Sequence, residues 1–176
     1  MSATVPDIAV GSRAERLLPR EPATRDLARG IYERVAHAPI LAPHGHVDPR
    51  LFLDDTAFAD PVALFISDDH YVTRLLHADG LSLDQLGLGE GGAAADPREV
   101  WRLFCDRWHL FAGTASGYWM RSTLDGVFGI RSAIDGEHAD ELYDTLQDAL
   151  AQPRLRPRAL LREFRIELIA TTDDPL

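Results

Sequence analysis

Apolar residues recur at helical spacing through most of the chain and predict a largely helical protein. In the first such series, Leu27, Ile31 and Val35 follow one another every fourth residue, which predicts a helix over 24–36 that Thr24 caps. Further helices are predicted to begin at Asp60, Asp69 and Asp96, over about 116–128 and 137–150, and at Pro157. Residues 1–23 lack this pattern and are expected to form a loosely ordered arm.

An aromatic series follows Asp96 and is expected to lie in the core rather than in a ligand pocket. Its members are Trp101, Phe104, Trp108 and Phe111. The single cysteine, Cys105, lies beside Phe104 and is expected to be a buried, unreactive thiol.

Two short segments read as β-strands. Residues 39–43 are apolar with a proline at each end, which suits a buried strand, although a segment this short is also compatible with a loop. Residues 166–172 alternate and carry β-branched side chains. A (β/α)8 barrel needs about 250 residues, whereas this chain has 176. We therefore expect an α/β protein in which residues 24–176 form the N-terminal part of an incomplete barrel, with about two strands and a helical insertion over about 55–160.

Charge and composition narrow the possible partners. The formal net charge is −10, with 18 basic and 28 acidic residues, which disfavours nucleic acid. Apolar runs are too short to span a membrane, and the first residues lack the pattern of a secretory signal. With one cysteine there is no disulfide framework, so a cytoplasmic protein is expected.

The pair His44 and His46 directly follows the first predicted strand. Residues i and i+2 of an extended segment point to the same side, so two imidazoles can face one metal ion. The spacing also arises by chance, and two loop histidines bonded to backbone or water remain an alternative. A catalytic metal site generally takes three protein ligands, and no third is evident nearby.

Two other short segments carry reactive groups. Asp69, His70 and Tyr71 place a carboxylate, an imidazole and a phenol at a helix start, although Asp69 alone could be a cap with two surface residues behind it. Thr172 and Asp174 follow the second predicted strand, where turn chemistry offers an equally simple explanation.

Taken in order, these motifs resemble the uronate isomerases, a branch of the amidohydrolase superfamily. The matching segments are Pro39-Ile40, His44-Gly45-His46-Val47-Asp48-Pro49, Asp69-His70-Tyr71 with Arg74, Phe128-Gly129-Ile130 and Thr171-Thr172-Asp173-Asp174-Pro175. The resemblance spans nearly all of the chain after residue 20 and covers about the N-terminal third of a family member. Arg121 departs from the pattern, because many relatives have a histidine there.

The resemblance implies interconversion of D-glucuronate with D-fructuronate and of D-galacturonate with D-tagaturonate. It assigns His44 and His46 to a divalent metal, Zn²⁺ in the first instance, with Mn²⁺ or another ion as alternatives. Tyr71 and His70 are implied as catalytic residues. A hexuronate is implied as the small-molecule substrate, and a homo-oligomer is compatible with the family.

The same resemblance assigns substrate contacts to Arg74, Thr172 and Asp174. Because the later barrel strands supply further ligands in the family, the chain alone is expected to be inactive. Two alternatives stay open on the residues themselves, a metal-dependent hydrolase of the same superfamily and a non-enzymatic helical interaction domain.

Overall fold

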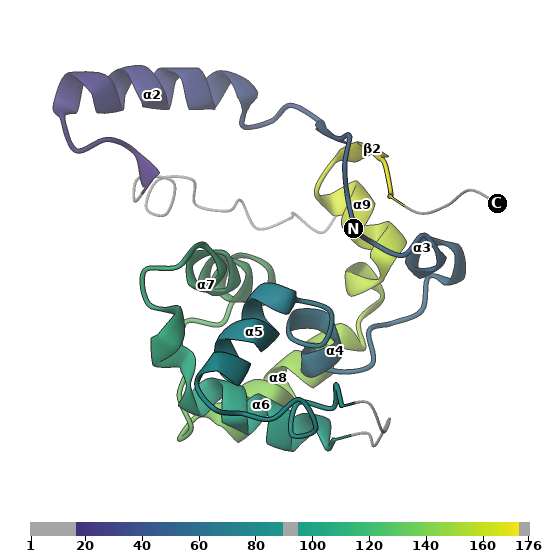
Figure 1. Cartoon of the computed structure of the whole chain (residues 1–176). Helices are drawn as coiled ribbons and strands as arrows, with labels where there is room; N and C mark the ends of the chain where they lie inside the picture. Colours follow the sequence, from purple (N-terminus) through teal and green to yellow (C-terminus); the bar gives the residue numbers. More distant parts are fainter. Residues whose placement is uncertain (1–16, 90–94, 173–176) are drawn as a thin grey trace. The chain divides into compact units, whose positions relative to one another are not determined.

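The computed structural model describes residues 17–89 and 95–172, which divide into two compact units. We call residues 17–48 and 161–172 the strand unit, and residues 49–89 and 95–160 the helical unit. In chain order the elements are α2 (Pro22–Val35), β1 (Ile40–Ala42), α3 (Arg50–Asp54), α4 (Pro61–Phe65), α5 (His70–Ala78), α6 (Pro97–Asp106), η2 (Trp108–Phe111), α7 (Ala115–Phe128), α8 (Ala139–Leu150), η3 (Pro153–Leu155), α9 (Pro157–Glu163) and β2 (Ile166–Ile169) (Figure 1). Neither unit contains a described helix with the length and apolar content needed to cross a membrane.

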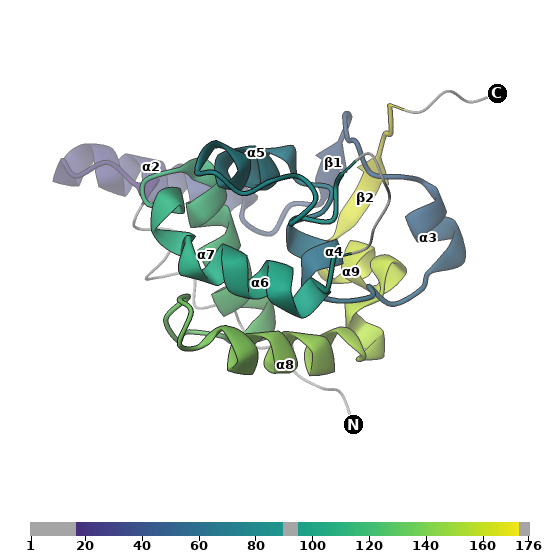
Figure 2. The ribbon, with the colours of Figure 1, turned by 60° about the horizontal axis from the view of Figure 1, so that its bottom comes forward.

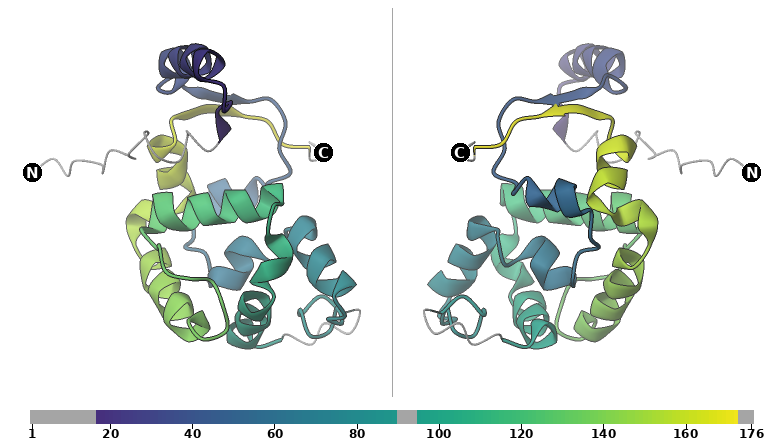
Figure 3. Two further views of the ribbon diagram at one scale, coloured as in Figure 1. Left: turned by 90° about the vertical axis from the view of Figure 1, so that its left-hand side faces the viewer. Right: turned by 90° about the vertical axis from the view of Figure 1, so that its right-hand side faces the viewer.

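In the strand unit, β1 and β2 run side by side as a parallel pair (Figure 2, Figure 3). Ala42 is in register with Ile169, and the N–H of Ala170 donates to the carbonyl of Ala42 at 2.8 Å. Before β2, the Arg165 guanidinium donates to the carbonyls of Ala36 and His37 at 3.0 and 2.8 Å. This contact ties the end of α2 to the start of β2.

The prediction that residues 39–43 form a buried strand is wrong in its burial. Ile40 is 47% exposed and Leu41 is 63% exposed. Within the described residues each strand has one neighbouring strand, and no side chain of the strand unit is buried. The apolar composition therefore predicted the strand correctly but not the solvent exposure of its side chains.

Helix α2 begins two residues earlier than the spacing predicts. The Glu21 carboxylate accepts from the N–H groups of Ala23 and Thr24 at 3.0 and 2.7 Å, so Glu21 is the cap instead of Thr24. Pro22 occupies the first helical position, where an N–H group would have no acceptor within the helix, so proline costs no hydrogen bond there. The predicted arm therefore loses its last two residues to the helix, while residues 1–16 lie outside the described part of the chain.

The helical unit has a continuous apolar core in which α6 packs against α8 and α4 lies against both (Figure 2). The ring of Phe104 lies 5.3 Å from that of Trp101, 5.7 Å from that of Trp108 and 5.4 Å from that of Phe111, measured between centroids. Trp101 is fully buried, and its indole N–H donates to the carbonyl of Ala139 at 3.1 Å. The core assignment of the aromatic series is confirmed, with Trp108 only partly buried.

Local capping explains where the helices begin. Asp60, Asp69 and Asp96 each accept from backbone N–H groups of the helix that follows, as predicted. The helix predicted from Asp96 ends at Asp106, and Trp108 lies in the 3-10 helix η2 that follows. In a 3-10 helix residues i and i+3 lie on the same side, so Trp108 and Phe111 share one side of η2. Thr114 caps α7, and Gly129 ends it with a φ of +70°.

Candidate functional site

His44 and His46 lie just beyond β1 with their rings turned toward each other. Their Nε2 atoms are 3.0 Å apart, and the rings meet edge to face at an interplanar angle of 84°. The Nδ1 atom of His46 lies 3.1 Å from Oγ1 of Thr172, the residue that follows β2 by three positions. Both imidazoles are exposed to solvent.

The parallel pairing explains why these three residues meet. With Ala42 opposite Ile169, the segments that leave the two strands run on together, and Thr172 reaches the level of His46. Gly45 makes this close approach possible, because a Cβ atom there would lie 3.2 Å from the carbonyl oxygen of Ala170. The sequence reasoning placed both segments at strand ends but did not predict the contact between Thr172 and His46.

The two imidazoles have the separation that one metal ion requires. Nitrogen ligands at about 2.0–2.1 Å from zinc lie about 3.3 Å apart at a tetrahedral angle and about 2.9 Å apart at a right angle. The observed 3.0 Å between the Nε2 atoms falls within that range. Within residues 17–89 and 95–172, no group of three or more His, Cys, Asp or Glu side chains could hold a metal. The described residues thus supply two candidate metal ligands, and Asp174 lies outside the described residues.

The predicted residues of the helical unit gather on the first turns of α5. The Asp69 carboxylate accepts from the N–H groups of Tyr71 and Val72 at 2.9 and 3.3 Å and fixes the start of the helix. The rings of His70 and Tyr71 are in contact, with centroids 4.2 Å apart and their planes tilted by 34°. The Arg74 guanidinium carbon lies 5.3 Å from the centroid of the Tyr71 ring, a cation–π contact.

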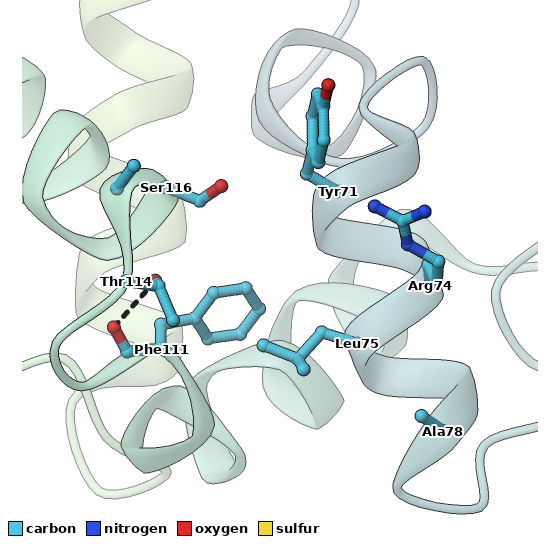
Figure 4. Close-up of a pocket in the computed structure, with 8 residues that line it drawn as sticks. Tyr71, Arg74, Leu75, Ala78, Phe111, Thr114 and Ser116 are labelled. Atoms are coloured by element: carbon cyan, nitrogen blue, oxygen red, sulfur yellow. Dashed lines mark hydrogen bonds between the residues drawn. The ribbon is translucent and has the colours of Figure 1, made fainter.

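Tyr71 and Arg74 also line a pocket of about 330 Å³ between α5 and the segment 111–116. Its lining residues are Tyr71, Arg74, Leu75, Ala78, Phe111, Thr114, Ala115 and Ser116. Figure 4 shows Leu75 projecting from α5 toward Phe111, while Tyr71 extends from the start of α5 and the Arg74 guanidinium lies near its ring. His70 does not line the pocket.

The polar groups of this pocket differ in whether they already have hydrogen-bond partners within the protein. The Thr114 hydroxyl donates to the carbonyl of Phe111 at 2.8 Å and accepts from the N–H of Gly117 at 3.0 Å. Within the described part of the chain, the hydroxyls of Tyr71 and Ser116 have no hydrogen-bond partner, and Arg74 has no carboxylate partner. The pocket thus offers a cation and two hydroxyls to a small polar ligand.

Sequence reasoning missed Ser116 and the segment around it as part of a site. The only signal was indirect, because helix periodicity placed a helix start near residue 116 without indicating what lay opposite. At Arg121, where the family resemblance led us to expect a histidine, the guanidinium donates to the carbonyl of Ser132 at 2.8 Å and lies 5.9 Å from the Trp108 ring.

Comparison with known proteins places this chain in a family. A family model described as glucuronate isomerase matches residues 21–176, which is most of the chain. This chain belongs to the glucuronate isomerase family. The family match includes both the facing histidines and the pocket on α5.

Relatives of the glucuronate isomerase family resemble the chain in sequence and in structure. It is 49% identical over 163 residues to a uronate isomerase of Corynebacterium efficiens, covering 92% of this chain and 34% of that protein. A crystal structure of glucuronate isomerase from Caulobacter crescentus matches with a TM-score of 0.87 and 42% identity, covering 90% of this chain and 34% of the other. A uronate isomerase structure from Thermotoga maritima matches with a TM-score of 0.78 and 27% identity, at 92% and 33% coverage.

The chain spans about a third of the length of these glucuronate isomerase relatives. The family model and the matched structures confirm the predicted resemblance of the chain to this family, and the described residues are mainly helical with a two-stranded parallel sheet.

Proposed function

We propose that this chain supplies the part of a uronate isomerase that holds two metal ligands and contacts the sugar acid. The reaction interconverts D-glucuronate with D-fructuronate and D-galacturonate with D-tagaturonate. The observation that carries the proposal is the convergence of the His44 and His46 Nε2 atoms within the segment that the family model matches. In this proposal β1 and β2 are the first two strands of a (β/α)8 barrel of the amidohydrolase type.

The metal-binding part of the proposal rests on neutral imidazoles. His44 and His46 would hold a divalent cation, Zn²⁺ in the first instance, through their Nε2 lone pairs. A bound divalent cation supplies positive charge that draws the substrate's oxygen atoms and polarises its carbonyl group. The chain's own contribution is the spacing and the orientation of the two rings.

The substrate-binding part of the proposal rests on the pocket of α5. A guanidinium binds a carboxylate through charge-assisted hydrogen bonds, so Arg74 is assigned to the acid group of the sugar. Tyr71 is assigned a hydrogen bond to a sugar oxygen, and its ring contacts that of His70. The pocket volume of about 330 Å³ lies at the small end of ligand sites, which suits a single sugar acid.

The isomerisation itself moves protons and needs no external oxidant or reductant. The proton on C2 is removed, a proton is added at C1, and the hydroxyl proton on the C2 oxygen passes to the C1 oxygen. Such transfers require an acid–base group within hydrogen-bond reach of the sugar. Tyr71, whose hydroxyl has no partner within the described residues, is the side chain of this chain assigned to that work.

A chimera tests the proposal directly. The third of the Corynebacterium efficiens relative that matches this chain would be replaced by residues 21–176, and fructuronate formation from glucuronate would be measured with added Zn²⁺ or Mn²⁺. We expect activity in the chimera, with large losses on the double change of His44 and His46 to Ala and on Tyr71→Phe. A chimera that folds, judged by circular dichroism and cooperative unfolding, yet forms no product would contradict the proposal.

The 176-residue chain by itself is proposed to be inactive. It spans about a third of its relatives, and its described residues provide two candidate metal ligands where catalytic sites generally use three. Incubation with glucuronate and a divalent metal should yield no fructuronate. Formation of product at a rate near that of the Corynebacterium efficiens relative would show that the remaining two thirds are dispensable.

A further inference from the structure

We propose that Thr172 is a positioning residue that holds the His46 ring with Nε2 facing His44, and so strengthens binding of a divalent cation. This inference rests on the proposed metal-binding role of the two histidines. It goes beyond that role because it gives the Thr172 hydroxyl a hydrogen bond to the metal ligand His46. The family resemblance had suggested that Thr172 contacts the substrate.

The hydrogen bond is built by the backbone of two segments far apart in the chain. Thr172 and His46 are 126 residues apart in sequence, and their side-chain atoms Oγ1 and Nδ1 are 3.1 Å apart. The strand ladder fixes this approach, since the bond from the Ala170 N–H to the Ala42 carbonyl lies just before both residues. Thr172 therefore reaches His46 through the register of the sheet, without a long flexible side chain.

The two histidines differ in how their rings are held. His46 has a neighbour at each ring nitrogen, Thr172 at Nδ1 and His44 at Nε2. Within residues 17–89 and 95–172, the only ring contact of His44 is with His46. Because Thr172 contacts the His46 ring directly and reaches His44 only through His46, its removal should release His46 and change His44 only through the contact between the two rings.

The hydrogen bond to Thr172 favours one of the two neutral tautomers of His46. A neutral imidazole has one N–H and one lone pair. For Nε2 to offer its lone pair to a cation, the ring proton must be on Nδ1. The Nδ1–H group then donates a hydrogen bond to the hydroxyl oxygen of Thr172. A hydrogen bond of this kind to the outer nitrogen of a ligating histidine fixes the ring and raises metal affinity, typically by about 10–100-fold.

Matched variants separate this role from a purely structural one. Thr172→Val keeps the side-chain shape and removes the hydroxyl, Thr172→Ser keeps the hydroxyl, and Thr171→Val repeats the change one residue away. Zn²⁺ binding to the full 176-residue chain would be measured by calorimetry for each variant. Long-range ¹H–¹⁵N spectra of the metal-free chain would report the protonation pattern of the His46 ring.

We expect Thr172→Val to weaken Zn²⁺ binding about tenfold or more, and Thr172→Ser and Thr171→Val to bind within about twofold of the wild-type chain. The spectra should show His46 losing its preference for the Nδ1–H form in Thr172→Val alone. Unchanged Zn²⁺ affinity and an unchanged His46 spectrum in Thr172→Val would overturn the inference and leave the metal site standing. Zn²⁺ binding that survives the change of both histidines to Ala would instead overturn the metal-binding role, and the inference with it.

Discussion

The carbonyl oxygen of Ala170 lies 3.2 Å from the position that a Cβ atom would occupy at Gly45. The chain segment between the two candidate metal ligands thus passes directly against the end of β2. The conformation of Gly45 is not the left-handed one that demands glycine, so the requirement here is space alone.

We predict that Gly45→Ala weakens Zn²⁺ binding by at least severalfold. The added methyl group meets a backbone oxygen, so the loop must shift by a few tenths of an ångström and the separation of the two Nε2 atoms changes with it. Calorimetric titration of the full chain measures the effect. Gly30→Ala is the matched control, since nothing lies within 4 Å of its Cβ position in α2, and it should leave Zn²⁺ binding unchanged.

Asp69→Ala should destabilise the helical unit by about 1 kcal/mol, because the first turn of α5 loses its cap. The same turn carries Tyr71 and Arg74, so loosening it should also alter the pocket. Urea unfolding measures the stability change. Asp69→Asn retains a capping oxygen and should be nearly neutral, and equal losses in the two variants would show that the cap is not the cause.

The thiol of Cys105 should make stability fall at alkaline pH. Burial, assisted by the negative charges of Asp106 and Asp135, raises the pKa of this thiol from 9.0 to about 12. When the pKa of a group is higher in the folded than in the unfolded chain, its contribution to the free energy of unfolding is complete below the unfolded pKa. This contribution decreases as the pH rises from the unfolded pKa to the folded pKa. The loss should therefore run from about pH 9 to about pH 12, reaching about 2 kcal/mol near pH 10.5.

Urea unfolding at pH 8 and pH 10.5 tests this expectation. Cys105→Ala removes the ionising group, so its stability should fall less over the same interval than that of the wild-type chain. The folded wild-type chain should also react slowly with thiol reagents at pH 8. Identical pH dependence in the two proteins would refute the assignment.

His138 should titrate above the ordinary histidine range. Its Nδ1 atom lies 2.7 Å from the Asp135 carboxylate, and this hydrogen bond, with the charge of Asp135, raises the pKa of His138. The same pair lowers the pKa of Asp135. The raised histidine pKa stabilises the fold at lower pH and the lowered carboxyl pKa stabilises it at higher pH, so the pair contributes most between the two unfolded values, about pH 4 to 6.5.

An NMR titration of the His138 ring protons checks this prediction. Asp135→Asn should bring the midpoint back toward the ordinary value, and added salt should reduce the shift because both groups are exposed. A midpoint that does not move on Asp135→Asn would show that the hydrogen bond is not responsible.

Much of the helical architecture was predictable because helix boundaries depend on neighbours within about four residues. Asp60, Asp69 and Asp96 cap the helices that their positions indicated, and α7 ends at Phe128, the last residue of the range predicted for it. The same kind of argument placed the cap of α2 at Thr24, whereas the cap is Glu21. Shorter side chains are the usual N-caps, so a glutamate was not recognised as one.

The sequence by itself determined the local features of this protein: its helical periods, its caps, the apolar segments that become strands and the two histidines spaced to face one side. Only the tertiary structure decided what those features meet. The contact of Thr172 with His46 joins residues 126 positions apart, and the pocket brings α5 against the segment 111–116. Such contacts depend on strand register and helix packing, which are set by surfaces that no short stretch of sequence contains.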